Sequence, residues 1–271
     1  ADTNEEKYTL EFINQIMDWI ENNPVRYGIN WSNTMEVGIR AANWTIALLY
    51  FQKSHNVTKD FLKQFLKSIQ EHGNHIYQNL ENLQQINSNH YIGNLFGLYI
   101  LSSICPNLNG SSKWLKFSKK ELEKEIIRQT DKDGWDYEAS TAYHRLVTEM
   151  FLYLYIIAQY FDQPFSKAYV NQLRKMLKVI HVMGKSDHTI PQIGDNDSSF
   201  SLCFDFDDDN LNISNLLNLS QRNNLITLED QNMGFFTYED AGFHFYKNDE
   251  IYFLIITGPK ELLGLGSHAH N

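Results

Sequence analysis

The sequence predicts a mainly α-helical protein that ends in a short antiparallel β-sheet. Through the first three quarters of the 271 residues, apolar side chains recur at the three-to-four-residue spacing of an amphipathic helix. From Gly234 onward the period changes to two, which is typical of strands. A hydrophobic content of 42% is enough to fill a sizeable core, so the chain is expected to form one large domain or two ordinary ones.

Helices are predicted one after another up to about residue 183. The first carries Phe12, Ile16 and Ile20 on one face. Those that follow are predicted around 33–51, 61–69, 89–104, 113–129, 140–161 and 165–183. The short connections carry the helix breakers Pro24, Gly73, Pro106, Gly110, Gly134 and Pro164. Short connections favour antiparallel neighbouring helices, stacked as a bundle, a solenoid or a closed ring.

The last quarter of the chain has a different character. Residues 205–215, DFDDDNLNISN, are acidic and rich in Asn, which favours a surface loop. Three strands are predicted after it, at about 234–239, 242–247 and 251–257, with turn sequences between them. Because three strands rarely bury a face alone, this sheet is expected either to pack on the helices or to continue beyond Asn271.

Charge and hydropathy narrow the classes of partner. The formal net charge is -10 and no basic run offers a phosphate footprint, which argues against nucleic acid. An anionic ligand would therefore need a locally cationic cleft. The longest apolar run, residues 151–158, is too short to span a bilayer, and the acidic start shows no signal peptide. Cys105 and Cys203 lack metal-type spacing, and Cys105 is expected to be a buried thiol.

One stretch of the N-terminal half, GINWSNTMEVGIRAANW, carries an unusual set of polar residues. Glu36 and Arg40 lie four residues apart on one helix face, with Asn43 and Trp44 a turn further on. The pattern fits a ligand-binding face. A solvated ion pair beside a buried tryptophan explains the same spacing.

A second stretch, SNHYIGNLFG, begins a predicted helix. Ser88, or the asparagine before it, can cap this helix, which puts Asn89 and His90 in the first turn. Backbone N–H groups and the helix dipole favour an anion there. Gly93 and Gly97 lie one turn apart and allow another helix to approach closely. An ordinary polar helix start is the alternative.

Two further stretches, DGWDYEASTAYHR and PQIGDNDS, lie in the second half. Tyr143 begins an apolar, central helix whose dipole favours a phenolate, and His144 and Arg145 follow it. Three aromatic or basic surface residues are the alternative. Asp195 and Asp197 follow a glycine, a pattern typical of a turn that hydrogen-bonds its own backbone.

The chain ends in GLGSHAHN. If the last strand continues, His268 and His270 point to the same face of it. A His-x-His pair on a strand can chelate a metal, or it can place one histidine on substrate and the other on metal. A flexible tail explains the sequence equally well.

Taken in this order, the motifs resemble those of the heparinase II/III-like polysaccharide lyases, which include related alginate lyases. The resemblance covers residues from about 24 to 271. It implies an (α/α) toroid over residues 1–228 and the first strands of an antiparallel β-sandwich over 229–271, with a cleft between them. Family members continue the final motif as His-x-His-x-Asp and a further strand. The resemblance therefore also implies that this chain is a piece of a longer protein.

The chemistry that the resemblance implies is β-elimination on a uronic acid unit of a polysaccharide. Such a reaction needs donors on the carboxylate at C5, a base for the C5 proton and an acid for the O4 leaving group. Asn89 and His90 match the residues that neutralise the carboxylate. Tyr143 matches the general acid, which in some members is also the base. His268 matches the base or a carboxylate partner, and His270 a ligand of a structural metal.

The resemblance also implies partners and a location. Local positive charge is expected from Arg40, His144 and Arg145, and sugar contacts from Asn43, Trp44 and Trp135. Elimination requires no cofactor; a structural divalent metal, zinc or calcium, is expected in the full-length protein, with the partners of His270 beyond Asn271. The implied substrate is a heparan-like, alginate-like or bacterial capsular polysaccharide. The implied location is the periplasm or outside the cell, with the cytoplasm left open.

Two other functions remain open from the sequence. A catalytically silent protein that kept the toroid would bind glycans or take part in polysaccharide assembly. A hydrolase would use paired carboxylates such as Asp195 and Asp197.

Overall fold

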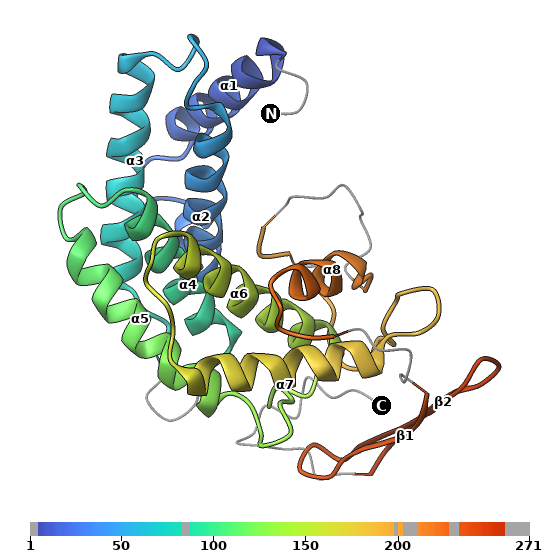
Figure 1. The fold of residues 1–271 in the computed structure, drawn as a ribbon. Coiled ribbons are helices and arrows are strands. Elements are labelled where there is room, and N and C mark those ends of the chain that lie inside the picture. Colours follow the sequence, from blue (N-terminus) through green and yellow to red (C-terminus); the bar gives the residue numbers. More distant parts are fainter. Residues whose placement is uncertain (1–4, 83–86, 198–199, 203–210, 228–232, 258–271) are drawn as a thin grey trace. The chain divides into compact units, whose positions relative to one another are not determined.

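The computed structural model describes residues 5–82, 87–197, 200–202, 211–227 and 233–257 of the chain. These residues contain eight α-helices, one short 3-10 helix and a three-stranded sheet (Figure 1). The chain divides into two compact units, residues 1–121 and residues 122–271. The predicted class, a mainly α-helical chain with an antiparallel sheet at its end, is confirmed. The predicted domain boundary between residues 228 and 229 stays a prediction.

The first unit is built from helices that begin where the sequence provides caps. They are α1 (Glu6–Asn22), η1 (Ile29–Trp31), α2 (Thr34–Phe51), α3 (Lys59–Gln78), α4 (Asn89–Ile104) and the start of α5 (Ser111–Arg128). The side chains of Asn33, Thr58 and Ser88 each accept a hydrogen bond from a backbone N–H of the first turn that follows. Each cap satisfies an N–H group that would otherwise lack a partner.

Helices α2 and α4 touch through their backbones. A Cβ atom added at Gly97 would lie 2.4 Å from the Cα of Gly38, and one added at Gly38 would lie 2.4 Å from the carbonyl oxygen of Gly93. No side chain fits at such distances, so three glycines permit this crossing. The close approach predicted at Gly93 and Gly97 is confirmed, and α2 is the helix that approaches.

The predicted break at Gly73 is wrong, because Gly73 lies inside α3. A Cβ atom there would lie 2.4 Å from the indole ring of Trp114 in α5. A single glycine inside a helix costs only about 1 kcal/mol relative to alanine. The space that it leaves lets a buried tryptophan pack against the helix backbone, which offsets that cost.

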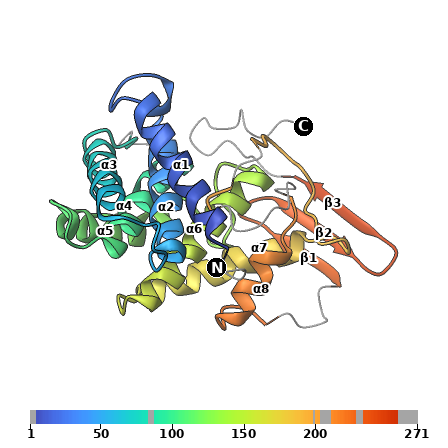
Figure 2. The ribbon, with the colours of Figure 1, turned by 90° about the horizontal axis from the view of Figure 1, so that it is seen from above.

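The second unit combines helices with the sheet. Its elements after α5 are α6 (Thr141–Tyr160), α7 (Lys167–Met183), α8 (Ser214–Arg222), β1 (Gly234–Tyr238), β2 (Phe243–Lys247) and β3 (Tyr252–Ile256). The strands form an antiparallel sheet in the order β1-β2-β3 (Figure 2). The surface loop predicted over residues 205–215 is wrong at its end, because helix α8 begins at Ser214. The side chain of Asn212 accepts a hydrogen bond from the N–H of Ser214, the first residue of the helix. The Asn-rich composition of this segment favours a loop, so it does not predict the helix.

The sheet packs on the helices of its own unit. The indole of Trp135 stacks on Phe243 with 3.9 Å between ring centroids. The ammonium of Lys247 donates to the carbonyls of Val182 at 2.8 Å and Gly184 at 2.9 Å, at the end of α7. Those carbonyls have no partner within the helix, so the lysine completes the helix end. Burial lowers the pKa of Lys247 to about 8. Of the two expectations for the sheet, packing on the helices is confirmed.

Among the described residues, no helix combines the length and the apolarity that crossing a lipid bilayer requires.

The crossing of α2 and α4 yields a stability prediction. We expect Gly97→Ala to lower the free energy of unfolding by about 1–3 kcal/mol, because the new methyl group meets backbone that cannot move aside. The effect opposes the gain of up to about 1 kcal/mol that alanine gives elsewhere in a helix. Urea denaturation followed by circular dichroism measures it. Lys63→Ala, on the exposed face of α3, is the control and should change stability by less than about 0.5 kcal/mol. A Gly97→Ala chain as stable as the parent would contradict the packing.

Candidate active site

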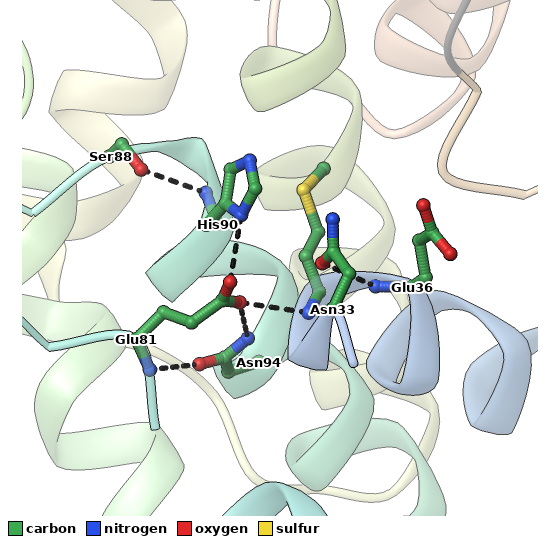
Figure 3. A network of polar contacts seen from close by, with 7 residues as sticks. Asn33, Glu36, Glu81, Ser88, His90 and Asn94 are labelled. Atoms are coloured by element: carbon green, nitrogen blue, oxygen red, sulfur yellow. Dashed lines mark hydrogen bonds and ion pairs between the residues drawn. The ribbon is translucent and has the colours of Figure 1, made fainter. Parts of the chain in front are cut away.

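The first turn of α4 carries Asn89 and His90 (Figure 3). The side chain of Ser88 caps the helix by accepting from the N–H of His90, as predicted. Asn89 is buried, whereas 42% of the His90 side chain is exposed. The structure therefore brings these two predicted residues together at a helix start where an anion is favoured, with His90 the more accessible of the two.

Glu81, in the connection between α3 and α4, holds this region together. Its Oε1 atom accepts from Nδ1 of His90 at 2.9 Å. Its Oε2 atom accepts from the backbone N–H of Met35 in the first turn of α2 and from Nδ2 of Asn94 in α4, both at 2.9 Å. Figure 3 shows the carboxylate between the two helix starts. One side chain therefore serves the N-terminal turns of two helices.

The charge state of Glu81 follows from these contacts. Burial alone would raise the pKa of its carboxyl, but hydrogen bonds from His90, Asn94 and Met35 together outweigh burial and hold the pKa below its usual value. The N-terminal ends of helices carry partial positive charge, which also favours an anion. Glu81 is therefore ionised at neutral pH.

Arg40 lies in a second cluster of the first unit. Its guanidinium donates to the carbonyl of Asn30 at 2.9 Å and to Nε2 of His72 at 3.0 Å. It also stacks 4.2 Å from the ring of Trp19. Burial lowers the pKa of Arg40 to about 10, so it stays charged at neutral pH. Its role in substrate binding stays a prediction; in this structure the arginine connects α2 to η1, to α3 and to aromatic rings.

Asn43 and Trp44 also make internal contacts. The Trp44 ring packs edge-on against Trp19, with 5.0 Å between ring centroids, and lies tilted against His72 at 5.2 Å, beside the apolar core of the unit. The amide of Asn43 donates to the carbonyl of Ile39, one helical turn earlier. Both side chains therefore make contacts within this unit, and their contact with sugar stays a prediction.

Tyr143 lies in the first turn of α6 in the second unit. Its backbone N–H donates to the hydroxyl of Ser140, which caps the helix, and that hydroxyl donates to the carbonyl of Asp195 at 2.6 Å. Residues 191–197 are thereby fixed across the start of α6. This arrangement places Asp197 so that its carboxylate accepts a hydrogen bond from the phenol of Tyr143.

The expectation of a favoured phenolate at Tyr143 is wrong. Burial, followed by the hydrogen bond to Asp197 and the charges of Asp197 and Asp195, raises the pKa of the phenol well above its usual value. These effects exceed the pull of the helix dipole. Tyr143 is therefore protonated at neutral pH and arranged to donate a proton.

His144 and Arg145 are buried in the structure, so they are not the surface residues that the sequence also allowed. Nδ1 of His144 accepts from the N–H of Asp136 at 3.1 Å. Burial lowers the pKa of His144 to about 4, so the expected positive charge there is absent at neutral pH. Arg145 pairs with Glu149 at 2.5 Å, which balances its charge locally. Trp135, only 2% exposed, packs under the sheet. Substrate contacts of all three stay predictions.

The remaining predicted residues, His268 and His270, lie outside the described residues. Within the described part of the chain, no group of three or more His, Cys, Asp or Glu side chains is arranged to hold a metal ion. Cys105 is a free thiol, half-buried rather than fully buried as expected, and burial raises its pKa to about 11.

Two residues of the candidate site, Glu81 and Asp197, are not identified by the sequence pattern. Glu81 stands in a polar connection with no spacing signal that links it to His90. Asp197 was noted only as half of a carboxylate pair, and nothing local links it to a tyrosine 54 positions away. An acidic residue a few positions before a helix start that carries a histidine is the signal that could identify Glu81. The sequence has no comparable signal for Asp197.

Buried neutral histidines predict acid sensitivity of the fold. Nδ1 of His72 donates a hydrogen bond to the carbonyl of Ser68, and Nε2 accepts one from Arg40, so the buried ring is neutral. Burial and the charge of Arg40 lower its pKa to about 3. The unfolded chain, with a pKa near 6.5, binds the proton more tightly, so stability is present above pH 6.5 and is lost as pH falls below it. We expect a loss of up to about 1.4 kcal/mol per pH unit from this histidine.

Urea titrations at pH 7, 6 and 5 measure this dependence. The control is His72→Phe, which should be less stable at pH 7 but lose less stability on acidification. Parallel pH profiles of the two chains would contradict a neutral His72.

The chain is similar in sequence to a known protein family and to characterised members of it. Residues 1–204 match the family described as Heparinase II/III N-terminus. A heparin-sulfate lyase of Pedobacter heparinus is 26% identical over 206 residues, which cover 71% of this chain and 30% of that protein. A heparin-sulfate lyase of Bacteroides stercoris is 24% identical over 213 residues, covering 70% of this chain and 31% of that protein. The chain thus spans about a third of the length of these relatives.

Solved structures show the same fold. A crystal structure of heparinase III superimposes with a TM-score of 0.71 at 20% identity, covering 91% of this chain and 40% of that one. The heparan sulfate lyase HepC from Pedobacter heparinus superimposes with a TM-score of 0.63 at 21% identity, covering 90% of this chain and 39% of that one. This likeness concerns the fold alone. With three quarters of its residues matched by one family, the chain belongs to the heparinase II/III family.

Proposed function

We propose that the protein to which this chain belongs is a polysaccharide lyase that cleaves a uronic-acid-containing acidic glycan by β-elimination. Membership of residues 1–204 in the heparinase II/III family carries the proposal. The curated relatives named as heparin-sulfate lyases support it, and they favour a heparan-like glycan over an alginate-like or capsular one.

The proposed reaction breaks the C5–H and C4–O4 bonds and forms the C4–C5 double bond and a new O4–H bond. A base removes the proton at C5 of the uronate, the electron pair forms the C4–C5 double bond, and the C4–O4 bond breaks as O4 takes up a proton. Charge develops on the C5 carboxylate as the proton leaves, so hydrogen-bond donors there lower the barrier. Asn89, and His90 when both of its ring nitrogens carry a proton, supply such donors at the anion-favouring start of α4.

Tyr143 is the proposed proton donor to O4. Its phenol is protonated at neutral pH because burial and Asp197 raise its pKa. The same hydrogen bond argues against the paired-carboxylate hydrolase, because Asp197 is engaged with a tyrosine. A hydrolase would place two carboxyl groups on either side of the scissile bond.

Other parts of the proposal concern residues outside the described part of the chain. His268 is the proposed base or carboxylate partner. His270 is the proposed ligand of a structural zinc or calcium ion in the full-length protein, and elimination itself needs no cofactor. The proposed location is the periplasm or the cell exterior, where acidic glycans are met.

The proton donor can be tested by substitution. We expect Tyr143→Phe in the full-length protein to lower kcat at least about a hundredfold, because the leaving O4 loses its acid. The measurement is the ultraviolet absorbance of the 4,5-unsaturated uronate released from heparan sulfate, alginate and bacterial capsular glycans. Tyr160→Phe, at the exposed end of the same helix, is the matched control and should retain activity.

The same assay separates the alternatives. A glycan whose uronate carboxyls have been reduced to alcohols should not be cleaved. Glycan binding by the parent protein without any rise in absorbance would favour a catalytically silent protein. New reducing ends without absorbance would favour hydrolysis, and a fully active Tyr143→Phe protein would contradict the assigned acid.

A further inference from the structure

We propose that Glu81 is a positioning residue that fixes the tautomer of His90 and thereby selects Nε2 as the ring atom that meets the uronate. The tautomer follows from the structure of this chain. The part that concerns the uronate rests on the proposed function.

The hydrogen bond at Nδ1 determines where the proton lies. An ionised carboxylate accepts hydrogen bonds and cannot donate them, so the 2.9 Å contact between Oε1 of Glu81 and Nδ1 of His90 requires a proton on Nδ1. Glu81 is ionised because its hydrogen bonds hold its pKa below the usual value. In the neutral ring Nε2 therefore carries the lone pair.

Glu81 is itself held on several sides. Its Oε2 atom accepts from Met35 N and Asn94 Nδ2, and its own N–H donates to Oδ1 of Asn94 at 2.7 Å. Asn94 is fully buried, and only 28% of the Glu81 side chain is exposed. The carboxylate therefore cannot rotate freely, and it fixes the imidazole both in direction and in tautomer. Such a partner at the second nitrogen is how proteins orient functional histidines.

The ring geometry then assigns the ligand side. Because Nδ1 is committed to Glu81, contact with the uronate falls to Nε2, on the opposite side of the ring (Figure 3). Nε2 of the neutral ring has only a lone pair, so His90 donates to the uronate carboxylate from Nε2 after that atom has taken up a proton. The Glu81 carboxylate at Nδ1 stabilises the imidazolium that results. Glu81 touches neither the substrate nor the reacting atoms in this account. It acts through His90.

Glu81→Gln is a sharp test because the existing contacts predict how the amide will lie. Met35 N and Asn94 Nδ2 are both donors at the Oε2 position, so the amide oxygen must occupy it. The amide NH₂ group then faces Nδ1 of His90. A donor at that place requires Nδ1 to accept, so the proton must move to Nε2.

The readout is a long-range proton–nitrogen NMR correlation on the full chain labelled with ¹⁵N-histidine, recorded where His90 is neutral. The signals of His90, one of 10 histidines, are assigned by their loss in His90→Gln. We expect the Nδ1–H tautomer in the parent chain and the Nε2–H tautomer in Glu81→Gln. The matched control is Asp60→Asn, which removes one negative charge from the first turn of α3 at an exposed position and should leave the tautomer unchanged.

An Nε2–H tautomer in the parent chain would overturn the proposal, and this result does not depend on whether Glu81→Gln folds. An unchanged tautomer in a folded Glu81→Gln chain would also overturn it.

Kinetics connect the tautomer to the reaction. In the active full-length protein, Glu81→Gln should lower kcat/KM roughly tenfold to hundredfold, because a neutral amide no longer stabilises the His90 imidazolium that donates to the uronate. Asp60→Asn should leave kcat/KM unchanged. Full activity of Glu81→Gln with a reversed tautomer would overturn the link to the uronate. If the parent protein shows no lyase activity on any glycan, the proposed function fails, while the NMR result still decides the tautomer.

Discussion

The backbone contact between α2 and α4 is the constraint on which the first unit depends. Gly38, Gly93 and Gly97 let the two helices meet without side chains between them. Both first turns then lie at one carboxylate, that of Glu81. Two neighbouring helix starts bring partial positive charges together, which is unfavourable unless an anion lies between them. Glu81 supplies that anion. The proposed function places a second anion, the uronate carboxylate, at the start of α4.

The second unit repeats this arrangement with different chemistry. A carboxylate from an irregular segment, Asp197, reaches the first turn of a buried helix and contacts the side chain assigned to the reaction, Tyr143. Glu81 does the same for His90 in the first unit. In each case the carboxylate sets where a proton lies: on Nδ1 of the imidazole, and on the phenol oxygen of the tyrosine. The rotation of each ring is therefore restricted by a fixed partner, and under the proposed function both side chains are oriented before substrate binds.

The sequence predicts local features of this protein well and long-range pairings poorly. Helix periodicity and caps such as Ser88 depend on neighbouring residues, so α4 was predicted from residue 89 to 104, its observed range. Gly93 and Gly97 indicated a close helix contact because one turn separates them. By contrast, the sequence predicts a helix break at Gly73, because Trp114, which packs against this glycine, is far along the chain. The partners of His90 and Tyr143 were missed for the same reason, and with Asp197 unseen, the helix dipole alone suggested a phenolate.

The central claim is that the start of α4 receives the uronate carboxylate. A crystal structure of the full-length Tyr143→Phe protein with a bound uronate oligosaccharide tests it most directly, because the substitution preserves the fold while slowing cleavage. We expect the carboxylate to lie within hydrogen-bonding distance of the Asn89 side chain and of Nε2 of His90, while Nδ1 of His90 keeps its hydrogen bond to Glu81. A bound carboxylate that contacts neither Asn89 nor His90 would contradict it.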